Sequence, residues 1–152
     1  MQKSTKKKVT LYSDGSSLGN PGPGGYGGIL KFNSHEKEFY GGEPHTTNNR
    51  MELRGVIEGL KFLKEPCDIT VVSDSSYVIN AINSWLKGWI KRDFKNVKNI
   101  DLWKEYIDIS KPHKITGIWV RGHNGHEENE RCDTLAYDEA QRQKELLIEK
   151  GK

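Results

Sequence analysis

The chain of 152 residues is long enough to bury the core of one domain without disulfides or a structural metal. No apolar run approaches the roughly 20 residues of a membrane-spanning helix. The basic stretch 1–8 also lacks the apolar segment of a signal peptide. Cys67 and Cys132 have neither metal-ligand spacing nor the density of a secreted disulfide scaffold. These features predict a cytoplasmic protein with reduced thiols and no membrane partner.

The formal charge of +3 is too small to indicate nucleic-acid binding by itself. Its distribution is more informative, because basic residues gather in 3–8 and again in 87–98, where Trp85, Trp89 and Phe94 lie among them. A basic segment with aromatic rings offers phosphate contacts and stacking surfaces. The alternative is a solvated amphipathic helix whose tryptophans pack inward. Composition leaves both open.

Three short strands are predicted in the first part of the chain. Alternating residues at 9–13 predict the first strand. Residues 14–25 contain too many glycines and prolines for a helix or a strand and are expected to form a loop. Two further strands are predicted at 27–32 and 37–40, which suggests an antiparallel meander.

A helix is predicted from Thr47 onward, because apolar residues recur with helical spacing at Leu53, Val56, Ile57, Leu60 and Leu63. Thr46 and Thr47 can cap this helix, and Pro66 is expected to end it. Glu52 precedes Leu53 directly. It should therefore lie at the border of the buried face, near the start of the helix.

Helices and strands alternate in the rest of the chain. Residues 68–73 are apolar and β-branched, as in a central strand buried on both faces, and this strand ends in Asp74. The pattern then predicts helices at 77–85 and about 99–109, a strand at 114–120 and a final helix from about residue 128. A loop with His123 and His126 follows the last strand, and the final helix carries Asp133.

These elements predict an α/β fold with a five-stranded mixed sheet flanked by helices, in which three antiparallel strands are joined by two parallel ones. Crossover connections bring the carboxyl ends of the first, fourth and fifth strands to one edge, where such sheets bind ligands. Asp14, Asp74 and the His123 loop follow these ends. Glu52 and Asp133 can reach the same edge from the flanking helices.

Carboxylates that converge repel one another unless cations neutralise them or their pKa values rise. Oxygen ligands without cysteine or paired histidines favour Mg²⁺ or Mn²⁺ over zinc. Two such ions can assist an in-line phosphoryl displacement, so phosphodiester hydrolysis is the predicted reaction class. A histidine in the 121–126 loop can carry a proton. The alternative for His123 and His126 is hydrogen bonding within the loop.

Four stretches closely resemble the cellular type 1 ribonuclease H family: YSDGS at 12–16 with its Gly-rich continuation, TTNNRMEL at 46–53, SDSSYV at 73–78, and VRGHNGH at 120–126 through NERCD at 129–133. They occur in the family's order and with its spacing, from about Val9 to Ala140. One such stretch would be a weak signal, whereas four in register are specific.

The resemblance implies a ribonuclease H fold over residues 9–148 after a basic tail at 1–8. It implies endonucleolytic cleavage of the RNA strand of RNA–DNA hybrids to 5′-phosphate and 3′-hydroxyl products, with a part in DNA replication through RNA primer removal. The implied ligands of two Mg²⁺ or Mn²⁺ ions in the substrate complex are Asp14, Glu52, Asp74 and Asp133. His123 matches the family's mobile catalytic histidine.

The resemblance also implies substrate contacts. Asn20, Asn48, Asn49 and Ser76 match residues that touch RNA sugars and bases, which fits the 2′-hydroxyl as the group that distinguishes RNA from DNA. The alternative role for Asn48 and Asn49 is helix capping. Thr47 and Asn99 match a pocket for a DNA phosphate.

Residues 85–99 match the family's basic protrusion, with Trp85, Trp89 and Phe94 beside the DNA strand. Its phosphate contacts would come from Lys87, Lys91, Arg92, Lys95 and Lys98. The short link 94–99 and His45, which replaces an arginine of some members, are departures that affect phosphate affinity rather than chemistry.

Two other functions fit parts of this pattern. A non-catalytic hybrid-binding module would keep the basic stretch and the asparagines but lose acids, whereas all four acids and His123 are present. A related metal nuclease or a reverse transcriptase domain is the other alternative. The basic protrusion and the self-contained ends favour a free-standing cellular enzyme, which we expect to be a monomer.

Overall fold

The structure, a computed structural model, describes residues 6–121 and 127–151. Its sheet confirms the predicted five-stranded mixed topology, with strand order β3-β2-β1-β4-β5. The strands are β1 (Lys7–Ser17), β2 (Gly22–Phe32), β3 (His35–Thr46), β4 (Cys67–Ser73) and β5 (Lys114–Trp119). The first three pair antiparallel, and β4 runs parallel to both β1 and β5.

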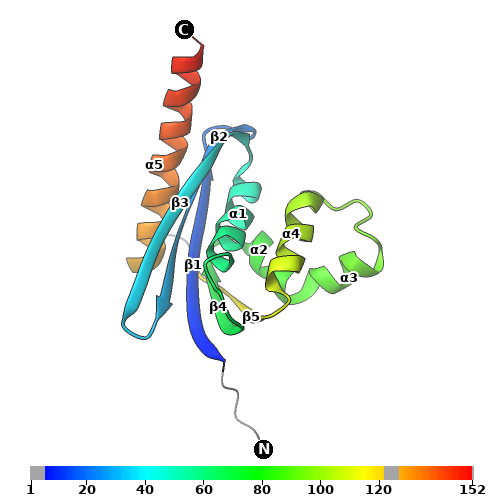
Figure 1. Cartoon of the computed structure of the whole chain (residues 1–152). Coiled ribbons are helices and arrows are strands. Elements are labelled where there is room, and N and C mark those ends of the chain that lie inside the picture. Colours follow the sequence, from blue (N-terminus) through cyan, green and yellow to red (C-terminus); the bar gives the residue numbers. More distant parts are fainter. Residues whose placement is uncertain (1–5, 122–126, 152) are drawn as a thin grey trace, which may run out of the picture.

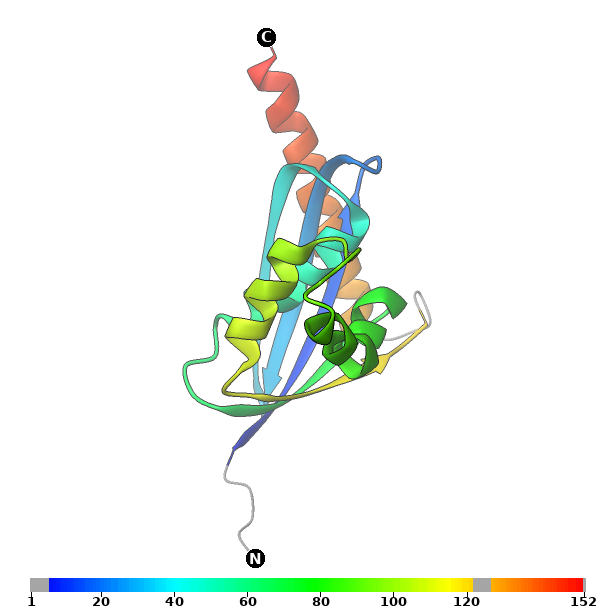
Figure 2. The ribbon, with the colours of Figure 1, turned by 90° about the vertical axis from the view of Figure 1, so that its right-hand side faces the viewer.

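The helices cover both faces of the sheet. They are α1 (Asn48–Leu60), α2 (Ser76–Asn80), a π-helical turn η1 (Ala81–Trp85), α3 (Leu86–Lys91), α4 (Ile100–Ser110) and α5 (Glu127–Lys150). In Figures 1 and 2, α5 lies on one face while α1 lies on the other, with α3 and α4 beyond it. Within the described ranges, no helix combines the length and apolar character needed to span a membrane.

The core lies between the sheet and α1. Leu53, Val56, Ile57 and Leu60 are fully buried, as their helical spacing predicts. The prediction that the helix runs to Pro66 is wrong, because α1 ends at Leu60 and residues 61–63 tighten into a turn with i→i+3 hydrogen bonds. Leu63 is consequently only partly buried.

The prediction of a loop over 14–25 is also wrong. β1 continues to Ser17 and β2 begins at Gly22, so that Asp14 pairs with Gly27 and only residues 18–21 connect the two strands. At Gly25 the missing side chain lets α5 pack almost directly on β2. A Cβ at Gly25 would lie 2.4 Å from the carbonyl oxygen of Ala136 on α5. Gly25 thus marks close packing of a helix on a strand.

Gly15 allows the same close approach on the opposite face. A Cβ at this position would lie 2.3 Å from the backbone nitrogen of Glu52 and 2.5 Å from the carbonyl carbon of Met51. Backbone atoms cannot yield as a flexible side chain can, so any larger residue would push α1 away from β1. The missing side chain at Gly15 therefore sets how closely Glu52 approaches Asp14.

We predict that Gly15→Ala lowers the free energy of unfolding by about 1–3 kcal/mol, as overpacking at a tight contact typically does. Urea denaturation measures the change. Gly88→Ala is the matched control, because a Cβ at Gly88 in α3 would come no closer than 3.6 Å to another side chain. Alanine in a helix interior should stabilise by about 0.5–1 kcal/mol. Stability of Gly15→Ala equal to or above wild type would contradict the predicted clash.

Candidate active site

Three predicted carboxylates meet at one point. Asp14 projects from β1, Glu52 from the second turn of α1, and Asp74 directly follows β4. One carboxylate oxygen of each lies within 4.8 Å of the other two. The three acids therefore converge as the sequence predicts, although Asp14 lies within β1, just beyond its pairing with β4, and does not follow the end of that strand.

Two of the three carboxylates are buried and Asp74 is partly buried, which makes the electrostatics of the cluster unfavourable. Asp14 is 6% exposed and Glu52 is 4% exposed. The pKa of Asp14 is raised from 3.8 to about 7, first by burial and also by the charge of Asp74. The pKa of Glu52 is raised well above its ordinary value by burial and by its proximity to Asp14. Glu52 lies inside the buried face and not at its border, because Gly15 opens space for it.

Asp133 reaches the cluster from the opposite face of the sheet. It lies on α5, and its hydrogen bond with Asp14 is a further cause of the raised pKa of Asp14. Asp133 does not belong to the group of three whose oxygens all lie within 4.8 Å of one another. The structure thus brings the fourth predicted acid beside Asp14, at the margin of the cluster.

Ion pairs fix the first turns of α5 against the β2–β3 hairpin. Arg131 donates to Glu36 at 2.7 Å and to Glu38 at 2.5 Å, while Lys31 on β2 pairs with Glu128. These contacts are partly exposed and each contributes little alone, but together they restrain one segment. The segment they restrain includes Asp133.

Asp74 is held by its backbone. The indole nitrogen of Trp119 donates to the Asp74 carbonyl at 3.0 Å, and the Ser73 hydroxyl accepts from the Ser75 backbone N–H at 3.0 Å. Ser75 in turn caps α2 by accepting from the Val78 N–H at 3.2 Å. The carboxylate of Asp74 is therefore positioned between a strand end and a capped helix start.

The cluster has the chemistry of a site for a hard divalent cation. All of its donors are carboxylate oxygens, the ligands that Mg²⁺ and Mn²⁺ prefer. The buried Oε2 of Glu52 has no hydrogen-bond partner in the described part of the chain. Such an atom is costly unless another group satisfies it, and a cation would do so.

The predicted RNA-contacting residues lie beside these acids. A pocket of about 270 Å³ is lined by Asn48, Asn49, Glu52, Asp74, Ser75, Ser76 and Tyr77. Asn20 lies next to it, with its side-chain oxygen accepting from the Asn48 backbone N–H at 3.2 Å. The side chain that caps α1 is that of Thr47, which accepts from the Arg50 N–H at 3.2 Å. Thr47, and not Asn48 or Asn49, therefore caps α1.

Thr47 and Asn99 come together through Arg50, for which the sequence predicted no role. Arg50 donates from its backbone to Thr47 and from its guanidinium to the Asn99 side chain at 3.3 Å. It also binds Asp101 through two hydrogen bonds of 3.0 and 2.9 Å, which lower the pKa of Asp101 to about 2. The sequence could have indicated a role for Arg50, because this residue lies within the TTNNRMEL stretch that resembles the family.

The basic protrusion combines the two structures that its sequence left open, a helix with an inward-packed tryptophan and an exposed basic surface with an aromatic ring. The helix predicted at 77–85 continues through η1 and α3 to Lys91. Trp89 packs against the buried Trp103 with ring centroids 5.4 Å apart, whereas Trp85 is 43% exposed. All five predicted phosphate contacts are exposed: Lys87, Lys91, Arg92, Lys95 and Lys98.

The prediction that Phe94 lies beside the DNA strand is contradicted. Phe94 is 8% exposed and belongs to the core cluster. It follows α3 in a left-handed backbone conformation, with φ of 59°, which turns the chain back toward the core. Its ring therefore cannot serve as a stacking surface.

His123 and His126 lie outside the described residues. The roles predicted for them from the sequence therefore stay predictions.

Comparison with known proteins gives a consistent result. The RNase H family model matches residues 6–141. A ribonuclease H of Sulfurovum sp. (strain NBC37-1) is 70% identical over 147 residues, which cover 97% of this chain and 100% of that protein. The solved structure of LC9-RNase H1, described as a type 1 RNase H with the type 2 active-site motif, is similar with a TM-score of 0.85 and 31% identity, covering 93% of this chain and 76% of that chain.

A more distant structure shares the fold alone. LC11-RNase H1, solved in complex with an RNA/DNA hybrid, matches with a TM-score of 0.68 and 20% identity, covering 88% of this chain and 97% of that chain. The family model and the Sulfurovum relative extend over most of the chain, including every described residue of the carboxylate cluster. The chain belongs to the ribonuclease H family.

Proposed function

We propose that this protein is an endonuclease that hydrolyses the RNA strand of RNA–DNA hybrids, leaving 5′-phosphate and 3′-hydroxyl ends. The observation that carries the proposal is the adjacency of two features. Three carboxylates converge within 4.8 Å, and two of them, Glu52 and Asp74, line the same pocket as Asn48, Asn49 and Ser76. Family membership and the hybrid bound by LC11-RNase H1 support the same substrate.

Asp14, Glu52 and Asp74, with Asp133 beside them, would hold Mg²⁺ or Mn²⁺, with two ions in the substrate complex. The bound cation supplies Lewis-acid stabilisation of the charge that develops on the phosphate. The protein's own part is to keep these carboxylates close together in a buried site. It does so through the contact of Gly15 with α1 and through the packing of α5 on β2.

The pocket beside the acids accounts for selection of the RNA strand. Side-chain amides and a hydroxyl can both donate to and accept from a 2′-hydroxyl, which DNA lacks. Asn48, Asn49 and Ser76 offer these groups next to Glu52, and Asn20 lies beside the start of α1. A strand bound here by its 2′-hydroxyls places its phosphate against the carboxylates.

The DNA strand would lie across α1 and the basic protrusion. Thr47 and Asn99, linked by Arg50, would bind one DNA phosphate through neutral donors and a guanidinium. The exposed Trp85, supported by Trp89, offers a stacking surface among exposed lysines. Phosphate contacts of this kind would supply most of the affinity.

Further parts of the proposal rest on the sequence resemblance. His123 would carry a proton to or from water or the leaving group, because imidazole titrates in the working range. The catalytic domain would span residues 9–148 after the tail 1–8. We propose a monomer that acts in the cytoplasm, with RNA primers in DNA replication among its substrates.

A non-catalytic hybrid-binding module is disfavoured by the cluster itself. Burying carboxylates that repel one another is costly and gives no advantage to a protein that only binds nucleic acid. An enzyme that uses a cation needs that arrangement. The convergence of Asp14, Glu52 and Asp74 therefore favours catalysis.

We predict that Asp14→Asn reduces hydrolysis of an RNA–DNA hybrid by roughly 10³-fold or more, because a lost cation contact is worth several kcal/mol in the transition state. Hybrid affinity should stay nearly unchanged, since phosphate contacts dominate it. Single-turnover cleavage and a filter-binding titration measure the two effects. Asp138→Asn, at an exposed carboxylate on α5, is the control. Undiminished cleavage by Asp14→Asn would contradict the metal assignment.

Stability should depend on pH through the same residue. Folding raises the pKa of Asp14 from 3.8 to about 7. The contribution of this carboxyl group to the free energy of unfolding is therefore complete below pH about 4 and is lost as pH rises through 7. Asp14→Asn should therefore raise the free energy of unfolding at pH 8, without divalent cations, by about 1–3 kcal/mol. Urea denaturation in EDTA at several pH values tests this. If the free energy of unfolding changed with pH in the same way for the variant and the wild type, the prediction would be contradicted, because ionised Asp14 would then not destabilise the folded protein.

Substrate selection is tested with three matched duplexes in the presence and absence of Mg²⁺. We expect Mg²⁺-dependent cleavage of the RNA strand of an RNA–DNA hybrid and no comparable cleavage of duplex RNA or duplex DNA, because only the hybrid presents 2′-hydroxyls on one strand and a DNA backbone on the other. Equal cleavage of all three would refute the role assigned to the asparagine pocket.

A further inference from the structure

The outermost strand, β5, has an edge that faces away from the rest of the sheet. Along an edge strand every second peptide group points outward, where it needs another partner. The Val120 backbone N–H donates to the Ser73 carbonyl of β4 at 3.0 Å, just after β5 ends. Counting back from Val120, the peptide groups of residues 115, 117 and 119 are therefore the ones on the outer side.

Asn83 supplies the partner in the middle of this edge. Its side-chain amide donates to the Gly117 carbonyl at 2.9 Å and accepts from the Gly117 N–H at 2.9 Å. One planar side-chain group thus makes both hydrogen bonds that a neighbouring strand would make. A Cβ at position 117 would lie 3.2 Å from both Asn83 Oδ1 and Ile79 Cδ1, which is closer than ordinary van der Waals contact. Asn83 and Gly117 therefore fit each other as a pair.

Asn83 lies in the middle of the π-helical turn η1, directly before the basic protrusion. The Leu86 N–H donates to the Ala81 carbonyl five residues earlier, so this turn contains one residue more than an α-helical turn. The exposed Trp85 ends the turn, and Lys87 follows in α3. In Figures 1 and 2, β5 passes beside the connection between α2 and α3. The Asn83–Gly117 pair consequently fixes the point from which the basic protrusion extends.

The same part of β5 also contacts the carboxylate cluster. Two residues after Gly117, the Trp119 indole donates to the Asp74 carbonyl at 3.0 Å. Residues 117–119 therefore connect Asn83 on one side with a residue of the candidate cation site on the other. This connection is short and lies within one strand.

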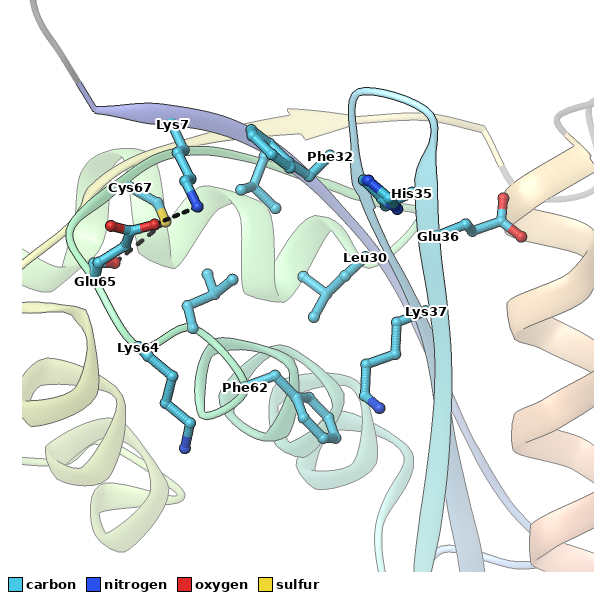
Figure 3. A pocket seen from close by; sticks show the side chains of 12 residues that line it. Lys7, Leu30, Phe32, His35, Glu36, Lys37, Phe62, Lys64, Glu65 and Cys67 are labelled. Carbon is cyan, nitrogen blue, oxygen red and sulfur yellow. Dashed lines mark hydrogen bonds and ion pairs between the residues drawn. The ribbon is translucent and has the colours of Figure 1, made fainter.

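The start of β5 is anchored separately. His113 Nδ1 accepts from the Cys67 backbone N–H at 3.0 Å, directly before the strand begins. Cys67 lines a pocket of about 340 Å³ together with Phe32 and Phe62, which Figure 3 shows at this end of the sheet. Asn83 thus adds an anchor in the middle of β5, on the side of α2 and α3.

We propose that Asn83 is a positioning residue for the hybrid, because its pairing with Gly117 holds the basic protrusion at a fixed place relative to the carboxylates. This inference rests on the proposed function, since it requires a DNA strand that meets the protrusion while the RNA strand meets the acids. Asn83 itself touches no reacting atom. Its effect is on how both strands are engaged at the same time.

The other contacts of this region cannot replace the pair. The Tyr77 hydroxyl accepts from the side chains of Asn99 and Trp103, and Trp89 packs against Trp103 with ring centroids 5.4 Å apart. These contacts join the helices α2 and α3 to α4 and to the segment before it. The Asn83 amide instead joins them to the sheet, which carries the acids Asp14 and Asp74.

The test compares Asn83→Ala with Asn80→Ala. Asn80 is exposed in α2, three residues earlier, so both changes remove the same side chain from the same run of helix. Asn83→Ala should raise the Kd for an RNA–DNA hybrid, measured by filter binding in EDTA, by about threefold to tenfold, because the net contribution of a hydrogen bond is modest. The single-turnover cleavage rate at saturating protein with Mg²⁺ should stay at the wild-type value. Asn80→Ala should match the wild type in both measurements.

Salt dependence separates positioning from a general loss of stability. The slope of log affinity against log salt concentration should become shallower in Asn83→Ala by about 0.9 for each phosphate contact that the protrusion loses. A variant that is only less stable would contain less folded protein with an unchanged slope. Amide hydrogen exchange, followed in ¹H–¹⁵N spectra, should be slower at Gly117 in the wild type than in Asn83→Ala.

An unchanged Kd and salt slope for Asn83→Ala would overturn the proposal, and so would an equal effect of Asn80→Ala. Equal exchange of the Gly117 amide in both proteins would also overturn it, because the hydrogen bond would then be absent in solution. Self-association of Asn83→Ala in sedimentation, with wild-type affinity for the hybrid, would reassign Asn83 to protecting the edge of β5. Failure of the wild type to cleave a hybrid that it binds in an Asn83-dependent way would count against the proposed function alone.

Discussion

The close approach of α1 to β1 at Gly15 is the contact on which the site depends. It brings the backbone of Glu52 to the position that a Cβ at residue 15 would occupy, and so buries Glu52 beside Asp14. Two carboxylates in such surroundings destabilise the folded protein when both are ionised, and their raised pKa values express that cost. The rest of the fold has to supply the free energy that keeps them together. A bound cation would offset this free-energy cost by neutralising the carboxylates.

The two faces of the sheet perform this task differently. On one face, the apolar side of α1 packs on β1 and β2 with Leu53, Ile57 and Leu60 fully buried, which anchors the helix that carries Glu52. On the other face, α5 packs on the glycines of β2 and is restrained near Asp133 by ion pairs with the β2–β3 hairpin. Acids from opposite faces consequently meet at one edge.

Much of this could be predicted from the sequence, because a buried helix face requires apolar residues at helical spacing, as in α1, and a strand buried on both faces requires a continuous apolar run, as in β4. Residues whose effect depends on contacts distant in sequence could not. The glycines at 22–25 suggested a loop, since glycine serves both flexible backbone and close packing, and at Gly25 only the position of α5 distinguishes the two. Phe94 and Trp85 look alike in the basic stretch, yet a left-handed turn directs Phe94 into the core, whereas Trp85 ends the helical turn η1 and is exposed. Arg50 acquires its role only when α4 brings Asn99 and Asp101 beside it.

The most direct test of the central claim is the proton balance of cation binding. Near pH 7 the free protein holds protons on the cluster, because the pKa of Asp14 is about 7 and that of Glu52 is well above its ordinary value. Isothermal titration of Mg²⁺ at pH 7 in two buffers of different ionisation enthalpy should therefore give different heats, corresponding to release of about one proton. Asp14→Asn should reduce this difference, because only Glu52 of the two would still hold a proton to release. Equal heats in both buffers for the wild-type protein would contradict the claim that buried, mutually repelling carboxylates form the cation site.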